Sequence, residues 1–137
     1  MRAVKRGVVP FFAVLAIALV LSQTGFATQQ SGQKVFWMVT IQVPIADLPA
    51  YHALTAEEIF PLQTRHGYNG VASWQTIVGD IEEVISVAEF ESMDAYLQAR
   101  QSLLGSAEWA EVSQRLGAMT RSVRTRLLTA TPYSPLQ

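Results

Sequence analysis

The side chains of this sequence best suited to chemistry are one histidine, one glutamate and a pair of arginines. His52 follows Tyr51 in a helix-like segment and can act as a general base near neutral pH. Glu89 lies at the end of a strand-like run and is the other candidate base. Arg124 and Arg126 alternate along a further strand-like run, so they share one face. Two guanidinium groups on one face suit an anionic or carbonyl-bearing ligand.

Each of these side chains also has a structural explanation, which stays open at this point. A histidine on the flank of a helix is commonly a surface residue, and His66, just before Gly67, can complement the dipole at a helix end. Charged residues on an outer strand protect a sheet edge against aggregation. The two histidines lack the spacing of a metal motif and the chain has no cysteine, so we predict no metal site.

A tryptophan adds a candidate of another kind. Trp74 lies in the middle of a strand-like run, where an aromatic ring can form the wall of a ligand cavity. The other large aromatic residues are interpreted as packing in the core or between subunits. The predicted ligand site therefore consists of Trp74, Glu89, Arg124 and Arg126.

Motifs for several reaction classes are missing from the sequence. It contains no Gly-rich phosphate loop, no G-x-S-x-G nucleophile elbow and no cysteine nucleophile. This argues against hydrolytic and phosphoryl-transfer enzymes, and we predict no cofactor.

Strand and helix signals alternate from residue 35 onward and must position these side chains. Residues 35–43 are apolar on one parity and mixed on the other, as in a central strand. A helix is expected after Asp47, with Pro49 in its first turn, and Pro61 is expected to disrupt it. Gly67 then suits a turn.

Two strands, two helices and a last strand complete the pattern. Residues 71–78 and 83–90 are rich in β-formers and are separated by a hairpin turn, and residues 121–128 form the last strand. Two successive helices are expected between residues 90 and 121, the first capped by Ser92 and the second by Ser106. The order predicts an α+β fold of the ferredoxin-like βαββαβ plan with an extra short helix.

One face of such a sheet has no helices over it. That face would still carry the apolar side chains of Phe36 and Met38. A second copy of the sheet is the simplest cover, so we predict a homodimer in which two sheets face each other.

The N-terminal segment has the composition of a secretory signal peptide. Three basic residues precede an apolar run over residues 8–21, which is shorter than the roughly 20 residues of a membrane-spanning helix. We predict a signal peptide over residues 1–27, cleaved after Ala27, a flexible leader over residues 28–34 and one domain over residues 35–137. The product would be periplasmic or secreted; an uncleaved anchor is the alternative.

The net charge of the cleaved protein argues against nucleic acid and anionic membranes as partners. Removal of residues 1–27 leaves seven basic against eleven acidic residues, a net charge of −4. Nucleic acid and anionic membrane surfaces select basic patches, so we predict neither as a partner of the cleaved protein.

Three parts of the domain resemble the NIPSNAP family in their order and spacing. They are PLQTRHG at residues 61–67 leading into VASW at 71–74, VAEFESMDA at 87–95, and SAEW at 106–109 with the TPYSP tail at 131–135. The resemblance spans nearly all of the domain and implies the dimeric α/β-barrel fold. The superfamily that it implies also includes cofactor-free monooxygenases and haem-handling enzymes. For this chain, an expectation of such chemistry rests on the shared fold alone.

These observations lead to one functional prediction and two alternatives. We predict an exported homodimeric module that binds a protein partner or a small apolar or weakly anionic molecule, because no catalytic constellation is recognisable. One alternative is a cofactor-independent monooxygenase or isomerase, with His52 or Glu89 as the base and Arg124 or Arg126 stabilising an enolate-like charge. The other is a dimerisation scaffold without a ligand.

Overall fold

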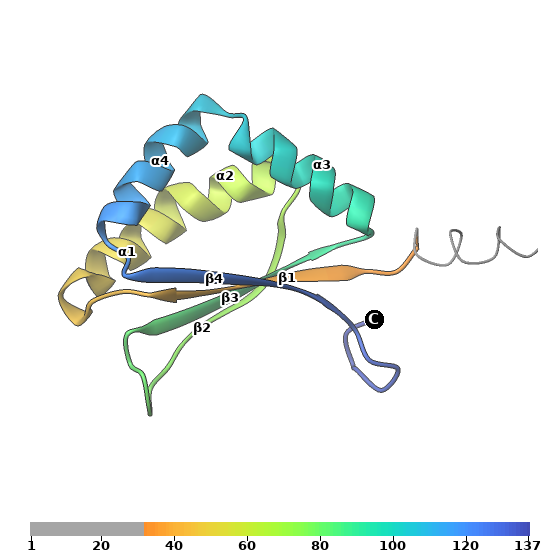
Figure 1. Ribbon diagram of the computed structural model, residues 1–137, viewed down its shortest axis with the longest axis horizontal. Coiled ribbons are helices and arrows are strands. Elements are labelled where there is room, and N and C mark those ends of the chain that lie inside the picture. The colour runs from red at the N-terminus through yellow and green to blue at the C-terminus, as the bar shows by residue number, and fades with distance from the viewer. Residues whose placement is uncertain (1–31) are drawn as a thin grey trace, which may run out of the picture.

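A four-stranded antiparallel sheet with helices over one face organises residues 32–137, which are the residues that the computed structural model describes (Figure 1). The strands are β1 (Val35–Gln42), β2 (Asn69–Gln75), β3 (Glu83–Phe90) and β4 (Ser122–Thr129), in the spatial order β2-β3-β1-β4. This order confirms the predicted ferredoxin-like plan. The predicted signal peptide, and all but the end of the predicted leader, fall outside the described residues.

The helices come in two groups, one after β1 and one after β3. The first group is η1 (Ile45–Asp47), α1 (Leu48–Leu54), η2 (Thr55–Ile59) and α2 (Phe60–Arg65). The second is α3 (Met93–Leu104) and α4 (Ala107–Ala118), the predicted extra helix. Ser92 and Ser106 cap α3 and α4 by accepting hydrogen bonds from the third backbone N–H beyond each of them, as expected.

The first helix is disrupted just before Pro61, as the sequence predicts, but it does not end there. The chain stays helical to Arg65, and Pro61 lies in the first turn of α2, where its missing N–H costs little. Immediately before it, η2 is a π-helical turn in which the N–H of Phe60 bonds to the carbonyl of Thr55. The wider turn is the local change by which the helix accommodates a proline in its course.

Strand β2 begins and ends earlier than the predicted range of residues 71–78. Gly67, with a φ of 91°, turns the chain after α2, and pairing with β3 starts at Asn69, two residues before a bulge between Gly70 and Ala72. The ladder ends at Gln75. The apolar residues 77 and 78 therefore lie exposed in the hairpin loop, and their β-propensity is outweighed by the turn.

The two faces of the sheet differ in their environment. Trp37, Val39 and Ile41 of β1 point toward the helices, and residues opposite them on β3 and β4 share that face. The other face has no helix over it in Figure 1. It carries the large apolar side chains Phe36, Met38, Trp74, Ile85, Val87 and Leu128. Trp74 and Leu128 are exposed there, whereas Phe36 is buried within the protomer.

Two clusters of buried side chains make up the core under the helices. The larger one contains an edge-to-face aromatic series from Trp37 through Tyr68 and Phe90 to Tyr96, with ring centroids 5.0–5.5 Å apart. The smaller one gathers around β1 and α1 and includes Tyr51. Trp37 packs against both clusters, so the two halves of the core meet at this side chain.

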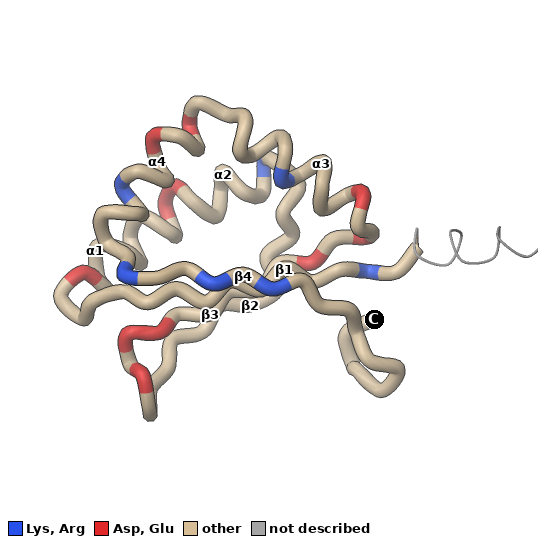
Figure 2. Tube along the Cα trace, viewed as in Figure 1, with Lys and Arg blue, Asp and Glu red and all other residues tan. Residues whose placement is uncertain are grey.

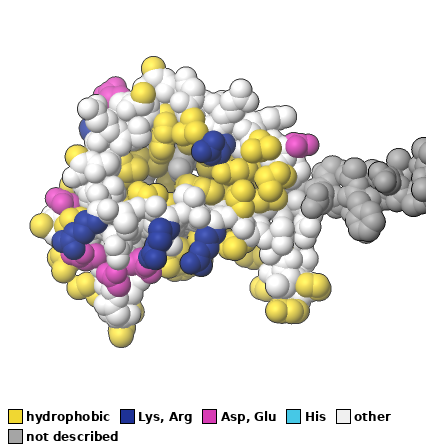
Figure 3. Space-filling view, viewed as in Figure 1, with side chains coloured by type: hydrophobic (Ala, Val, Ile, Leu, Met, Phe, Trp, Pro, Cys, Tyr) yellow, Lys and Arg dark blue, Asp and Glu magenta, His cyan; other side chains and the backbone are white. Residues whose placement is uncertain are grey.

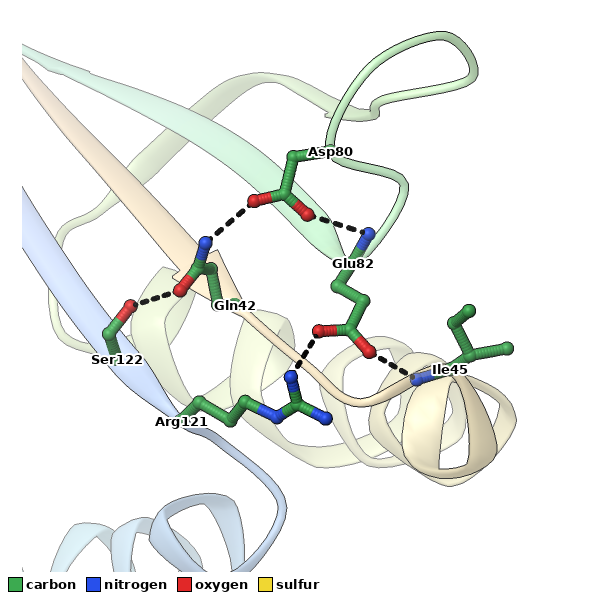
Figure 4. Close-up of polar contacts among 6 residues, drawn as sticks. All are labelled: Gln42, Ile45, Asp80, Glu82, Arg121 and Ser122. Carbon is green, nitrogen blue, oxygen red and sulfur yellow. Dashed lines mark hydrogen bonds and ion pairs between the residues drawn. The ribbon is translucent and has the colours of Figure 1, made fainter.

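A polar network fastens one end of the sheet (Figure 4). Gln42, at the end of β1, donates to Asp80 in the β2–β3 loop (2.6 Å) and accepts from Ser122 at the start of β4 (3.0 Å). Glu82 pairs with Arg121 at 2.7 Å beside it. The network ties three strands together where the backbone ladders end; with Arg121 largely exposed, its role is to fix geometry more than to add stability.

Candidate functional site

A cavity of about 300 Å³ lies between the helices and the covered face of the sheet. Side chains from β1, β3, β4 and all the α-helices line it, and it opens beside β4, where Val123 and Thr125 are exposed on the covered face. Figure 3 shows this hollow bordered by hydrophobic side chains. Its volume is at the lower end of the range for small-molecule sites.

Aromatic residues form much of the cavity wall. Trp37 rises from the sheet, Tyr51 from α1 and Trp109 from α4, while Tyr68 and Tyr96 continue the wall toward α3. Because the lining includes members of both core clusters and Trp37 between them, the cavity lies where the two halves of the core do not close completely. Such a surface favours a largely apolar ligand.

One ion pair holds the helical side of this cavity in place. Arg115 of α4 donates from both terminal guanidinium nitrogens to Glu58 of the π-helical turn, and this hydrogen-bonded pairing lowers the pKa of the Glu58 carboxyl. Arg65 and Glu108 approach to 3.9 Å between the same two helical layers. These contacts fix α4 over the segment that carries Thr55.

Two neighbouring hydroxyl groups supply polarity at the α1 side of the cavity. Burial raises the pKa of the Tyr51 phenol, and hydrogen bonding with the Thr55 side chain opposes that shift. Thr55 Oγ1 is shielded from solvent, and the Tyr51 phenol is the polar group that it meets.

A second polar group lies near α3. Burial, aided by the nearby Tyr96, raises the pKa of the Tyr68 phenol to about 12, and the positive charge of Arg100 acts in the opposite direction. Arg100 lines the cavity and is exposed to solvent. Both phenols with raised pKa stay protonated at neutral pH, so they can donate hydrogen bonds but are poor bases.

The two predicted bases lie elsewhere. His52 is exposed, and its Nε2 is 2.9 Å from Oε1 of Gln75. Glu89 lies on the uncovered face, 3.7 Å from Lys34, and accepts a hydrogen bond from Asn69 at 2.7 Å. Neither lines the cavity, and the described lining contains no His, Asp or Glu at all. His52 and Glu89 therefore lie away from this cavity, and their role as bases stays a prediction.

The other predicted ligand residues share the uncovered face with Glu89. Arg124 approaches Glu83 at 3.4 Å, Arg126 lies opposite Met38 of β1, and Trp74 is 57% exposed. Figure 2 shows basic residues following β4 and acidic residues at the β2–β3 end of the sheet. The structure brings these residues to one face but around no cavity, so their role as a ligand site remains a prediction.

Sequence reasoning missed the polar residues of the cavity itself. Thr55 was a detectable signal, because it lies one helical turn from both Tyr51 and Ile59 and so places a hydroxyl on an apolar helix face. Arg100 gave no such signal, since nothing in the spacing of α3 separates it from an ordinary surface arginine. Within residues 32–137, no group of three or more His, Asp or Glu side chains could hold a metal ion.

Comparison with known families and structures gives a consistent fold. The family model for NIPSNAP matches residues 38–135. A NIPSNAP family protein from Agrobacterium tumefaciens aligns with a TM-score of 0.71 at 23% identity, covering 77% of this chain and 92% of that one. A NIPSNAP-like domain protein from Burkholderia xenovorans aligns at 0.70 and 14% identity, covering 76% and 90%.

A further structural relative has a described activity. SnoaB, a cofactor-independent oxygenase from Streptomyces nogalater, aligns with a TM-score of 0.59 at 17% identity, covering 75% of this chain and 98% of that one. At such identities the likeness shows the fold alone. A search of curated proteins gave no match. Among the described residues, no helix is both long and apolar enough to cross a membrane.

Proposed function

The chain belongs to the NIPSNAP family, and we propose that it binds a small, largely apolar molecule in the cavity between its helices and its sheet. The cavity carries the proposal: it is walled by aromatic rings, has an opening beside β4 and contains a few polar groups. Its lining lacks a carboxylate or imidazole base, which supports binding without chemistry.

Blocking the mouth of the cavity tests this function. Val123 lines the cavity on β4 and is 53% exposed, so Val123→Trp should fill the opening without disturbing buried packing. We expect at least ~10-fold weaker binding of the neutral fluorescent probe N-phenyl-1-naphthylamine, about 1.4 kcal/mol. The matched control is Val78→Trp in the hairpin loop, where the side chain is 87% exposed and the affinity should not change. Equal binding by both variants would refute the cavity as the site.

Cofactor-independent oxygenation is the second candidate, and the activity printed for SnoaB is the observation in its favour. Its residue assignment has lost support, because His52 and Glu89 lie off the cavity. Formation of an oxygenated product from a bound molecule, with no cofactor added, would favour the enzyme over the binding module.

We also propose that two copies associate through the uncovered sheet face. That face combines large apolar side chains with arginines on β4 and glutamates on β3, which gives a second copy both hydrophobic surface and opposite charges. A protein partner, the other occupant that the sequence left open, would compete for this face. Native mass spectrometry of protein from its own host separates a retained small molecule, a second copy and a different protein.

Export remains part of the proposal and has its own test. If residues 1–27 are a signal peptide, the exported protein should begin at Thr28, and Ala27→Trp should block cleavage because the peptidase pocket accepts small residues. Intact mass of the protein in the extracytoplasmic fraction measures this directly. The full-length mass in that fraction for the unmodified protein would support the anchor instead.

A further inference from the structure

A second cavity, of about 350 Å³, lies between α2 and the edge strand β2. It borders the first cavity, because Phe60, Gln63 and Tyr68 line both. The lining that residues 32–137 supply to this second cavity comes from α2, β2, β3 and the turn before β2, and it contains no charged residue. In the order of the strands, the first cavity reaches from β3 to β4 and the second from β3 to β2.

Small side chains of the sheet explain why this second cavity exists. The strand register places Gly70 of β2 opposite Ala88 of β3, and Ala88 opposite Trp37 of β1, so Gly70 and Ala88 share the face under the helices. Ser73, opposite Ser86, follows on the same face. A bulge after Gly70 bends the strand as well. The side chains under α2 are therefore too small to fill the space between helix and strand.

The residues shared by the two cavities differ in how firmly they are held. Tyr68 is 6% exposed and packs edge-to-face against Trp37 and Phe90, so its ring is fixed. Phe60 is 40% exposed and Gln63 is half-buried, and they lie three residues apart on α2. Side chains of this kind change rotamer without a change of the backbone. The boundary between the cavities therefore has one fixed wall and two side chains that can rotate.

Resting on the proposed function, we propose that the two cavities form one channel that binds a single-chain amphiphile. Its alkyl chain runs from the first cavity past Phe60 and Gln63 into the second, and its polar head stays in water at the opening beside β4. A slender chain fits between the rotated side chains and the Tyr68 ring, whereas a fused ring system would require α2 to move. The chain also covers the Phe60 ring, which is otherwise in contact with water.

Neutral primary alcohols of increasing length test the channel. The series is 1-hexanol, 1-octanol, 1-decanol and 1-dodecanol, and displacement of N-phenyl-1-naphthylamine from the first cavity gives each affinity. A methylene group that leaves water for an apolar surface strengthens binding by up to ~4-fold, and one that stays in water adds nothing. For the unmodified protein we expect the affinity to rise along the whole series.

A variant that fills the second cavity alone assigns the effect. A Cβ atom at Gly70 would meet no atom within 4 Å, and the backbone there is not left-handed, so Gly70→Phe places a ring in the cavity without a clash. N-phenyl-1-naphthylamine and 1-hexanol should bind this variant as they bind the unmodified protein. The rise should end at a shorter alcohol, and 1-dodecanol should bind ~10-fold more weakly.

Gly117→Phe is the matched control. Gly117 is exposed on α4, a Cβ atom there would also meet nothing within 4 Å, and the residue lines neither cavity. This variant should keep the full rise from 1-hexanol to 1-dodecanol. Circular dichroism checks the fold of both variants, and Gly70→Leu fills the same space with less volume if Gly70→Phe does not fold.

The outcomes separate the channel from the proposed function. A rise that Gly70→Phe shortens and Gly117→Phe preserves supports the channel. If N-phenyl-1-naphthylamine binds but the alcohols give the same series in all three proteins, the channel is wrong and the first cavity remains the site. If neither the fluorescent probe nor any alcohol binds the unmodified protein, both proposals fail.

Discussion

Replacing Phe90 with alanine is expected to lower the free energy of unfolding by about 3–5 kcal/mol. Phe90 is 4% exposed and stands between Tyr68 and Tyr96, with ring centroids 5.0 Å and 5.3 Å away, both in edge-to-face geometry. Removing the ring loses its burial, two aromatic contacts and the packing around the cavity left behind. The effect is large because this ring connects β3 to the helix that carries Arg100.

Urea denaturation followed by circular dichroism measures this change, and Phe60→Ala is the matched control. Phe60 is 40% exposed on the helix, so its loss should cost less than about 1 kcal/mol. Equal losses for the two variants would show that the aromatic series is not the centre of the core. Because N-phenyl-1-naphthylamine requires a formed cavity, a folded Phe90→Ala protein should also bind it more weakly.

Introducing a charge at the centre of the uncovered face is expected to convert the proposed dimer to a monomer. Val87 lies opposite Met38 of β1 and Ala72 of β2 on that face. Val87→Glu would bury a carboxylate against apolar side chains in any sheet-to-sheet dimer, whereas in a monomer the same side chain reaches water. We expect a dimer for the unmodified protein at micromolar concentration and a monomer for the variant.

Size-exclusion chromatography with light scattering gives the mass of each species. Val78→Glu adds the same charge in the exposed hairpin loop and should leave the dimer intact. A monomeric unmodified protein would contradict the dimer, and a dimeric Val87→Glu variant would move the interface to another surface. An unfolded variant is recognised by circular dichroism, and Trp74→Ala, at an exposed position on the same face, then provides the milder test.

The C-terminal tail illustrates how a family signature differs from a structural role. Ser134 donates its backbone N–H to Thr131 at 2.9 Å, and the Gln137 side chain bonds back to the same carbonyl at 3.1 Å. The tail therefore folds into a turn of its own after β4, and Tyr133 within it is exposed. The motif helped to identify the family, while its side chains are not part of the cavity.

The plan of the fold was predictable because it depends on local and periodic signals. The alternation of residues 35–43, the serine caps of α3 and α4, and the glycine turn after α2 each act over a few residues, and each is present as expected. Details that the sequence did not predict arose where local rules compete. A π-helical turn accommodated Pro61, and the hairpin loop displaced the end of β2.

The candidate site was less accessible to the same reasoning. The sequence predicted that Glu89, Arg124 and Arg126 share one face of the sheet, since strand register follows from periodicity, but it did not reveal the cavity under the helices. A cavity forms where the helices and the sheet do not pack together completely. The residue pattern of a single segment does not predict such a gap.

By itself, the sequence determined the family, the order of the elements and which residues share each face of the sheet, because these follow from caps, turns and periods of two or 3.6 residues. Only the tertiary structure showed the cavity between the helices and the sheet. It brought Tyr51, Thr55 and Arg100 from three helical segments around one largely apolar volume. The physical reason is that burial and hydrogen-bond satisfaction depend on packing between layers, which is fixed by the assembled fold.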